Sequence, residues 1–340
     1  AAWDDVAVTA DAVRSTLGRL RRALRDPAEA PRFIETVPRL GWRFIGRVIP
    51  AGDHVWIVQP QSDAAETPHE ADHPTFVGRD TESDQLVQRF ARAQAGNRQL
   101  VFVTGEPGIG KTALTDAFLT RIRSTPNLAI AQGNCIEHYG GGEPYLPALE
   151  ALEGLCAAIG GSGPTETLRR HAPMWLAPLP SLTEPEERVQ ISRQIQGATQ
   201  QRLIREFARA IEILARDHPI VLWIDDLHWS DTSTLELLGF LLQRREPARL
   251  LVIATHRPFD PEDERGARLD ALRSELKAHG LCRELPLSFL SQQAVRQHLE
   301  ARFGAFAATP PGHALAEYVH HATSGNPLFM VETVRLLEEQ

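Results

Sequence analysis

The stretch "LVFVTGEPGIGKTALTDAFLTRI" (100–122) joins an apolar run, a glycine-rich turn and a helical pattern. Its centre, from Gly105 to Thr112, fits G-x-x-x-x-G-K-[ST] at every fixed position. The apolar run predicts a strand over 100–104, and the residues after the turn predict a helix over 111–123. Strand, loop and helix in this order are the context that a phosphate-binding loop requires, so the stretch predicts a nucleotide site in an α/β fold.

The composition of the loop fits this purpose. Glycines let the backbone wrap closely round an anion with its N–H groups turned inward, and the start of the following helix attracts negative charge. Lys111, one of two lysines in the chain, is expected to neutralise phosphate oxygens, and the Thr112 hydroxyl to bind Mg²⁺. The nucleotide-binding residues expected in the loop are Gly105, Glu106, Pro107, Gly108, Ile109, Gly110, Lys111, Thr112 and Ala113.

A second apolar run ends in two adjacent carboxylates, in "VLWIDDLHWSD" (221–231). Two like charges at the end of a buried strand are costly unless a cation or strong hydrogen-bond donors compensate them. Beside a phosphate loop, we expect Asp225 to hold Mg²⁺, directly or through water, and Asp226 to orient or deprotonate the attacking water. The simpler alternative is a strand end followed by a helix N-cap, where Asp is common.

A third apolar run, "LLVIATHRP" (250–258), ends in polar residues. We expect Arg257 to sense the γ-phosphate or to stabilise the transition state, as a catalytic group with Lys111 and Asp226. The alternative is a solvated arginine at a strand end, since basic residues are common in loops.

From residue 75 onward, short apolar runs alternate with helical stretches, which indicates a parallel α/β sheet. The expected strands are 100–104, 128–132, 220–224, 250–255 and 282–287, and the expected helices are 111–123, 145–158, 188–216, 231–244 and 266–279. Two segments, 160–166 and 173–185, predict an irregular insertion. After Pro286 the pattern is wholly helical.

Six motifs occur in a fixed order along the chain, and the set identifies a protein family more specifically than any single motif does. They are "FVGRDTESDQL" (76–86), "GEPGIGKT" (105–112), "GNCIEHYGGGEPYLPALEAL" (133–152), "VLWIDDLHWSD" (221–231), "LLVIATHRP" (250–258) and "GNPLF" (325–329). Over residues 75–340 the chain resembles the ATPase module of the STAND class, the signal-transduction ATPases with numerous domains. The likeness is greatest to the branch in bacterial multidomain regulators and adenylate-cyclase-associated proteins.

This resemblance implies that Val77, Gly78 and Arg79 lie near the adenine or ribose of bound ATP or ADP. It also implies that Pro327 touches the base side of the nucleotide. The alternatives are a loop ahead of the first helix and a helix that starts at Pro327. In this class a helical lid or winged-helix module, here 288–340, closes over ADP and swings away when ATP replaces it. The resemblance also implies a C-terminal sensor that receives a signal or partner, and we expect this sensor to be missing from a chain that stops at Gln340.

The N-terminal segment differs from the rest in charge. Residues 1–48 contain nine Arg and six Asp or Glu, a net charge of +3, so the remainder carries −8 − 3 = −11. "VTADAVRSTLGRLRRALRDP" (8–27) predicts one basic amphipathic helix, and "RFIETVPRLGWRF" (32–44) predicts a hairpin. A basic helix followed by an Arg-tipped hairpin predicts a winged helix on DNA, with Arg39 reaching a phosphate or the minor groove. The alternative is a solvated helix face in an arginine-rich chain.

The amino-acid sequence of this segment also resembles the C-terminal part of OmpR/PhoB-type effector domains. That resemblance implies that the recognition helix directs Arg14, Ser15, Arg19 and Arg22 toward bases or phosphates. Only the recognition helix and the wing are present, so a partial winged-helix segment is expected to precede the P-loop NTPase.

These observations predict a domain plan. A partial winged-helix domain (1–48) is followed by a linker (49–74), a P-loop ATPase core (75–287) and the helical lid (288–340).

The longest apolar runs are about five residues, against ~20 for a membrane span, so no membrane contact is expected. Three widely spaced cysteines favour reduced thiols in the cytoplasm. The stretch "HYGGGEPY" (138–145) is either a mobile lid over the phosphates or a flexible loop.

The function that follows is a transcriptional regulator that uses ATP as a conformational switch and resets by slow hydrolysis. We expect self-association in the ATP state, which would pair the DNA-binding heads. One alternative is a P-loop enzyme with a dedicated substrate, such as a motor or phosphotransferase. The other is a scaffold that holds a nucleotide and never hydrolyses it.

Overall fold

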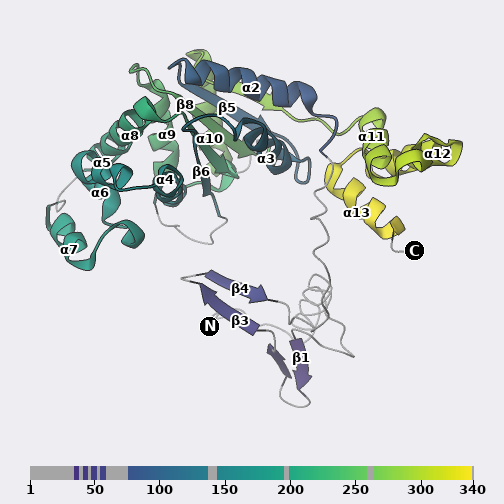
Figure 1. Ribbon diagram of the computed structural model, residues 1–340, viewed down its shortest axis with the longest axis horizontal. Coiled ribbons are helices and arrows are strands. Elements are labelled where there is room, and N and C mark those ends of the chain that lie inside the picture. Colours follow the sequence, from purple (N-terminus) through teal and green to yellow (C-terminus); the bar gives the residue numbers. More distant parts are fainter. Residues whose placement is uncertain are drawn as a thin grey trace. The chain divides into compact units, whose positions relative to one another are not determined.

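The computed structural model divides the chain into two units, Ala1–Asp72 and His73–Gln340. It describes residues 34–37, 41–44, 47–51, 54–58, 76–136, 144–194, 199–258 and 264–338. Figure 1 shows both units. The division falls two residues before the predicted end of the linker, while the finer domain plan stays a prediction.

Within its described residues, the first unit contains two antiparallel strand pairs. β1 (Ile34–Val37) pairs with β2 (Gly41–Phe44), where the sequence predicts the hairpin of the wing. β3 (Arg47–Ala51) pairs with β4 (His54–Val58), so the first residues of the predicted linker form strands instead. The predicted recognition helix lies outside the described residues, together with its DNA-binding candidates Arg14, Ser15, Arg19 and Arg22 and with Arg39 of the wing.

The second unit is built round a parallel sheet of five strands in the order β6-β7-β8-β5-β9. The strands are β5 (Gln99–Thr104), β6 (Ala129–Asn134), β7 (Ile220–Asp225), β8 (Leu250–His256) and β9 (Arg283–Pro286). All five predicted strands are confirmed to within two residues at either end. Because β5 is inserted between β8 and β9, the strand that feeds the phosphate loop lies inside the sheet, where ligand crevices form at the carboxyl edge.

Helices cover both faces of this sheet (Figure 1). α2 (Asp80–Gln94) and α3 (Lys111–Ile122) cover one face, and α4 (Leu146–Ile159), α8 (Gln200–Asp217), α9 (Thr232–Gln243) and α10 (Glu264–Ala278) cover the other. Strand alternation explains the division, because Leu100 and Phe102 pack on the α4 side whereas Val101 and Val103 pack on the α2 side. A sheet covered on both faces accounts for the continuous apolar runs in the sequence.

The predicted irregular insertion is wrong, because this region is helical. It contains α5 (Gly163–His171), α6 (Pro173–Leu176), a 3₁₀ turn (Pro180–Leu182) and α7 (Pro185–Gln194). Leu168, Trp175 and Leu176 are at most 1% exposed, so burial against α8 stabilises helices too short to be stable alone. The single helix predicted over 188–216 is likewise wrong: α8 begins after Thr199, whose hydroxyl accepts from the Arg202 N–H at 3.3 Å.

The helical pattern predicted after Pro286 is confirmed. α11 (Gln292–Phe303), a 3₁₀ turn (Gly304–Ala308), α12 (Pro310–Thr323) and α13 (Pro327–Glu338) form a module with its own apolar core. Val295, Val319 and Met330 are central to that core, each at most 2% exposed. Among the helices of the described ranges, none has the length and apolar character needed to cross a bilayer.

Candidate nucleotide-binding site

The glycine-rich loop joins β5 to α3 at the carboxyl edge of the sheet. Gly108 and Gly110 have φ angles of 75° and 92°, in the left-handed region that residues with a Cβ rarely adopt. At Gly105 the constraint is space, because a Cβ there would lie 2.8 Å from Cγ2 of Ile109. Glycine is therefore required at 108 and 110 by the backbone angles and at 105 by the space beside Ile109.

Lys111 begins α3 and turns its side chain back into the loop. Its Nζ donates to the carbonyl oxygens of Gly105 (2.8 Å) and Glu106 (3.2 Å). Burial lowers the pKa of this ammonium, Asp226 opposes the shift, and Arg257 adds to it. The side chain is 9% exposed, so a positive charge is held at the mouth of the loop by the loop's own carbonyls.

Asp225, the last residue of β7, is oriented by two hydroxyl groups. The Thr112 hydroxyl of α3 donates to one carboxylate oxygen at 3.4 Å, and the Thr255 hydroxyl of β8 donates to the other. Thr255 is fully buried and sits beside β7 in the sheet. The carboxylate therefore faces the first turn of α3, where the loop ends.

Asp226 points elsewhere because the backbone turns sharply between the two aspartates. Its φ and ψ of 50° and 45° are left-handed, and its N–H donates to the Thr255 hydroxyl at 2.9 Å. Its side chain makes no capping hydrogen bond, and the N-cap of α9 is Asp231, which accepts from the Thr234 N–H at 3.0 Å. The structure thus favours separate positions for the two carboxylates over a shared capping role.

The side chain of Asp226 lies close to a buried imidazole. Nδ1 of His228 is 3.8 Å from Asp226 Oδ1. Burial, with help from the Arg257 and Lys111 charges, lowers the pKa of His228 to about 4. This ring is therefore neutral at pH 7 and adds no positive charge beside Asp226.

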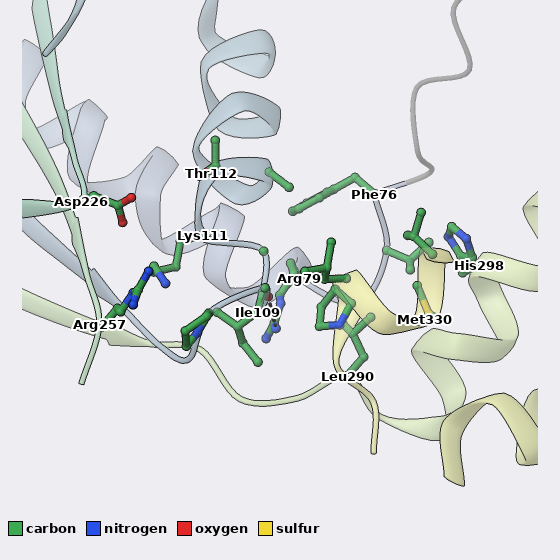
Figure 2. Close-up of a pocket in the computed structure, with 18 residues that line it drawn as sticks. Phe76, Arg79, Ile109, Lys111, Thr112, Asp226, Arg257, Leu290, His298 and Met330 are labelled. Carbon is green, nitrogen blue, oxygen red and sulfur yellow. Dashed lines mark hydrogen bonds between the residues drawn. The ribbon is translucent and has the colours of Figure 1, made fainter. Parts of the chain in front are cut away.

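Arg257 follows β8 and is exposed. Its guanidinium lies over the Trp229 ring, 5.7 Å from the ring centre, a cation–π arrangement that favours the charged group there. Figure 2 shows Lys111 and Arg257 approaching each other, with Asp226 nearby. The three residues predicted to be catalytic therefore line one end of a common cavity.

This cavity has a volume of about 490 Å³, within the range of small-molecule sites. Its other end is largely apolar, and Figure 2 places His298 and Met330 there, away from Lys111. The predicted residues that line it are Val77, Arg79, Pro107, Gly108, Ile109, Gly110, Lys111, Thr112, Ala113, Asp226, Arg257 and Pro327. The predicted residues outside its lining are Gly78, Gly105, Glu106 and Asp225.

Six lining residues were missed by sequence reasoning. They are Phe76, Leu290, His298, Leu328, Met330 and Val331. Phe76 and Leu328 lie inside the quoted motifs "FVGRD" and "GNPLF", so the motifs contained a signal for them. Leu290, His298 and Met330 belong to the helical module, and nothing in their local pattern distinguishes them from core residues.

Arg79 is 5% exposed and connects the phosphate loop to the chain ahead of α11. Its guanidinium donates to the carbonyl oxygens of Ile109 (3.2 Å) and Ser288 (2.6 Å), and pairs with Glu82 at 3.2 Å. The neighbouring Gly78 is close to α11, since a Cβ there would lie 2.4 Å from the Ala294 Cβ. The motif before α2 therefore holds the loop and the helical module together.

The loop also contacts the start of α13. The Leu328 N–H donates to the Gly108 carbonyl at 3.2 Å, and a Cβ on Gly110 would lie 3.9 Å from Cγ of Pro327. The helical module is therefore docked directly on the phosphate loop.

Comparison with known proteins relates the chain to a family. The model of the AAA ATPase domain matches residues 75–253. An uncharacterised protein of Rhizobium meliloti (strain 1021) is 28% identical over 198 residues, which are 54% of this chain and 18% of that protein. The chain thus spans less than a fifth of this curated relative.

Two solved structures are also similar. The Walker-type ATPase of Pyrococcus abyssi is 15% identical, with a TM-score of 0.45 over 75% of this chain and 66% of that chain. A signal transduction ATPase with numerous domains (STAND) and a tetratricopeptide repeat sensor, from Pyrococcus horikoshii, is 16% identical. Its TM-score is 0.38 over 75% of this chain and 29% of that chain.

Proposed function

Since this chain belongs to the AAA ATPase domain family, we propose that it is an ATP-operated switch that binds ATP or ADP with Mg²⁺ and hydrolyses ATP slowly. The observation that carries the proposal is the shared cavity. The phosphate loop, Asp226 and the start of α13 all line it, so a nucleotide bound there would contact the helical module. The further steps to DNA binding and transcription rest on the sequence pattern of the N-terminal segment.

The phosphates would lie in the glycine loop, with the base toward the apolar end. Lys111 now donates to the carbonyl oxygens of Gly105 and Glu106, and phosphate oxygens would replace these acceptors with charged ones. Val77, Arg79 and Pro327 line the cavity and would border the adenosine. Burial of the ammonium strengthens its attraction for a phosphate, because the local dielectric constant is low.

The residues present fit a magnesium ion. The Thr112 hydroxyl and an Asp225 carboxylate oxygen lie 3.4 Å apart at the end of the phosphate loop, and both are the hard oxygen ligands that Mg²⁺ prefers. These two residues would hold the ion, which neutralises charge on the β- and γ-phosphates when bound. In the described ranges, no group of three or more His, Cys, Asp or Glu is arranged to hold a metal.

Hydrolysis requires a group that orients water and groups that stabilise negative charge. Asp226 lines the cavity with its side chain about half exposed, and would orient or deprotonate the attacking water. Lys111 and Arg257 approach the same region and would stabilise charge on the transferred phosphoryl group (Figure 2).

The switch would operate through the docked helical module. ATP and ADP differ in their contacts at the phosphate loop, and only such differential contacts can shift the docking equilibrium. The open form would self-associate and pair the DNA-binding heads of a cytoplasmic regulator. A signal would reach it through a C-terminal sensor.

The nucleotide proposal is tested by mass spectrometry of the nucleotide released from purified protein, together with steady-state phosphate release. Bound ADP and slow turnover are expected. Fast turnover, or phosphate transfer to an acceptor, would favour an enzyme with a dedicated substrate. Asp226→Asn should lower phosphate release and retain binding, with Asp217→Asn on the exposed end of α8 as control. Unchanged release would favour the non-hydrolysing scaffold.

The DNA proposal is tested by salt-dependent binding of the full-length protein. Arg14→Ala and Arg22→Ala should each weaken binding, and each lost phosphate contact should lower the salt slope by about one. Binding that both variants leave unchanged would remove this part of the proposal.

A further inference from the structure

The side chain of Asn326 makes contacts in two directions at the start of α13. Its Oδ1 accepts from the backbone N–H groups of Leu328 (3.0 Å) and Phe329 (3.4 Å), the pattern of an N-cap. Its Nδ2 donates to the carbonyl oxygen of Pro107 in the phosphate loop, at 3.4 Å. Asn326 is 7% exposed, and its contacts in both directions are partly buried.

The two N–H groups settle the orientation of this amide. A carboxamide has one acceptor and one donor end, and the acceptor end must face the helix N-terminus. The donor end is therefore left facing Pro107. A second hydrogen bond joins α13 to the next residue of the phosphate loop: the Leu328 N–H donates to the Gly108 carbonyl at 3.2 Å.

These contacts bear on the phosphate site through peptide geometry. In a trans peptide the C=O and N–H point in opposite directions. Because Asn326 holds the Pro107 carbonyl on the α13 side, the N–H of Gly108 is turned away from α13. Inward N–H groups are what a phosphate loop offers to its ligand.

We propose that Asn326 is a positioning residue that couples docking of the helical module to the nucleotide-ready form of the phosphate loop. It acts through Pro107 and Gly108 without touching the nucleotide. One amide serves both partners, so undocking of α13 releases the Pro107 carbonyl in the same event. This inference rests on the proposed nucleotide binding and adds to it the residue that links binding to the module.

The experiment measures the release rate of a fluorescent ADP analogue with Mg²⁺ present, together with thermal unfolding. Asn326→Ser keeps a capping oxygen but is too short to reach Pro107. Asn326→Asp keeps the cap and replaces the donor with an acceptor. Both variants should release the analogue about two- to tenfold faster than wild type, the effect of one net hydrogen bond, with little change in melting temperature.

The matched control is Thr309→Ala. The Thr309 hydroxyl caps α12 of the same module, accepting from the Gly312 N–H at 3.3 Å, and it does not line the nucleotide cavity. This variant should lower the melting temperature and leave the release rate unchanged. Equal acceleration in Thr309→Ala would overturn the inference, because it would trace the effect to general loss of module stability.

The remaining outcomes are also distinct. Release at the wild-type rate in both Asn326 variants overturns the inference and leaves the proposed nucleotide binding intact. Acceleration in Asn326→Asp alone overturns it as well, because repulsion between the new carboxylate and the phosphates then explains the result. Failure of the wild-type protein to bind the analogue overturns the proposed function and this inference together.

Discussion

Leu328 and Gly108 form the closest link between the helical module and the phosphate loop. Their backbones share a hydrogen bond of 3.2 Å, and a Cβ on Gly108 would lie 2.8 Å from the Cβ of Leu328. The glycine thus permits both the left-handed turn of the loop and the close approach of α13. Any added side chain must disturb one of the two.

Gly108→Ala is expected to weaken both ADP binding and docking of the module. The control is Gly280→Ala, since Gly280 has a similar φ, 68°, and a Cβ added there would have no atom within 4 Å. Gly280→Ala should cost only the left-handed strain of about 1–2 kcal/mol in unfolding free energy. ADP titration and chemical denaturation of both variants provide the measurement. Equal ADP affinities of Gly108→Ala and the control variant would contradict the importance of the contact between Gly108 and Leu328.

Thr255→Val is expected to reduce Mg²⁺-dependent ATP turnover. The hydroxyl donates to Asp225 and accepts from the Asp226 N–H at 2.9 Å, so valine removes both hydrogen bonds. Asp225 then keeps only the weaker contact with the Thr112 hydroxyl, at 3.4 Å. The cost should be about 1–3 kcal/mol in stability, with a fall in kcat greater than the fall in ADP affinity. Thr183→Val, at a buried threonine in the insertion, is the stability control. Normal turnover in Thr255→Val would mean that Asp225 needs no such orientation.

His228 predicts a specific loss of stability in mild acid. Its pKa is lowered from 6.5 to about 4 in the folded protein, so between these pH values the imidazole binds a proton in the unfolded chain but not in the folded chain. The contribution of His228 to the free energy of unfolding is therefore fully present above pH 6.5 and is lost as the pH falls toward 4. Between pH 7 and pH 5, wild type should lose up to about 2 kcal/mol more than His228→Gln.

Urea denaturation at the two pH values measures this difference. His321→Gln, at an exposed position of α12, is the control for the loss of one imidazole. A His228→Gln variant with the same pH dependence as wild type would show that the imidazole is not kept neutral by burial.

Arg79→Lys is expected to weaken ADP binding about tenfold. Arg79 contacts the carbonyl oxygens of Ile109 and Ser288 with one guanidinium nitrogen, at 3.2 and 2.6 Å, and Glu82 with the other, at 3.2 Å. Lysine keeps the charge but has a single nitrogen, so it cannot make these contacts at both places together. Arg92→Lys, at an exposed position of α2, is the matched control. ADP titration measures the loss of affinity, and limited proteolysis of the segment before α11 measures the loss of the Ser288 contact. Unchanged affinity would limit Arg79 to a structural role.

The insertion marks a limit of prediction from local pattern. Leu168 and Trp175 occur among Gly and Pro residues that indicate loops, yet both are at most 1% exposed. Trp175 also donates its indole N–H to the Leu203 carbonyl of α8, 2.8 Å away. The periodicity of a nine- or four-residue helix is too short to read, so burial against a distant partner decides its structure.

What the sequence by itself determined was the strands, the phosphate loop and the fold class. These depend on local order: an apolar run of five residues, glycines at fixed spacing and a helix that follows directly. Physical constraints on backbone and burial act there over about ten neighbouring residues, and a single sequence records them.

The tertiary structure alone decided how the site is assembled. The neighbouring Asp225 and Asp226 diverge because Asp226 adopts a left-handed backbone that Thr255, on another strand, supports. His298 and Met330 reach the cavity because their helices pack as a module against the loop. Such contacts join residues up to about two hundred positions apart, and their free energy depends on shape and distance in space, which no local pattern contains.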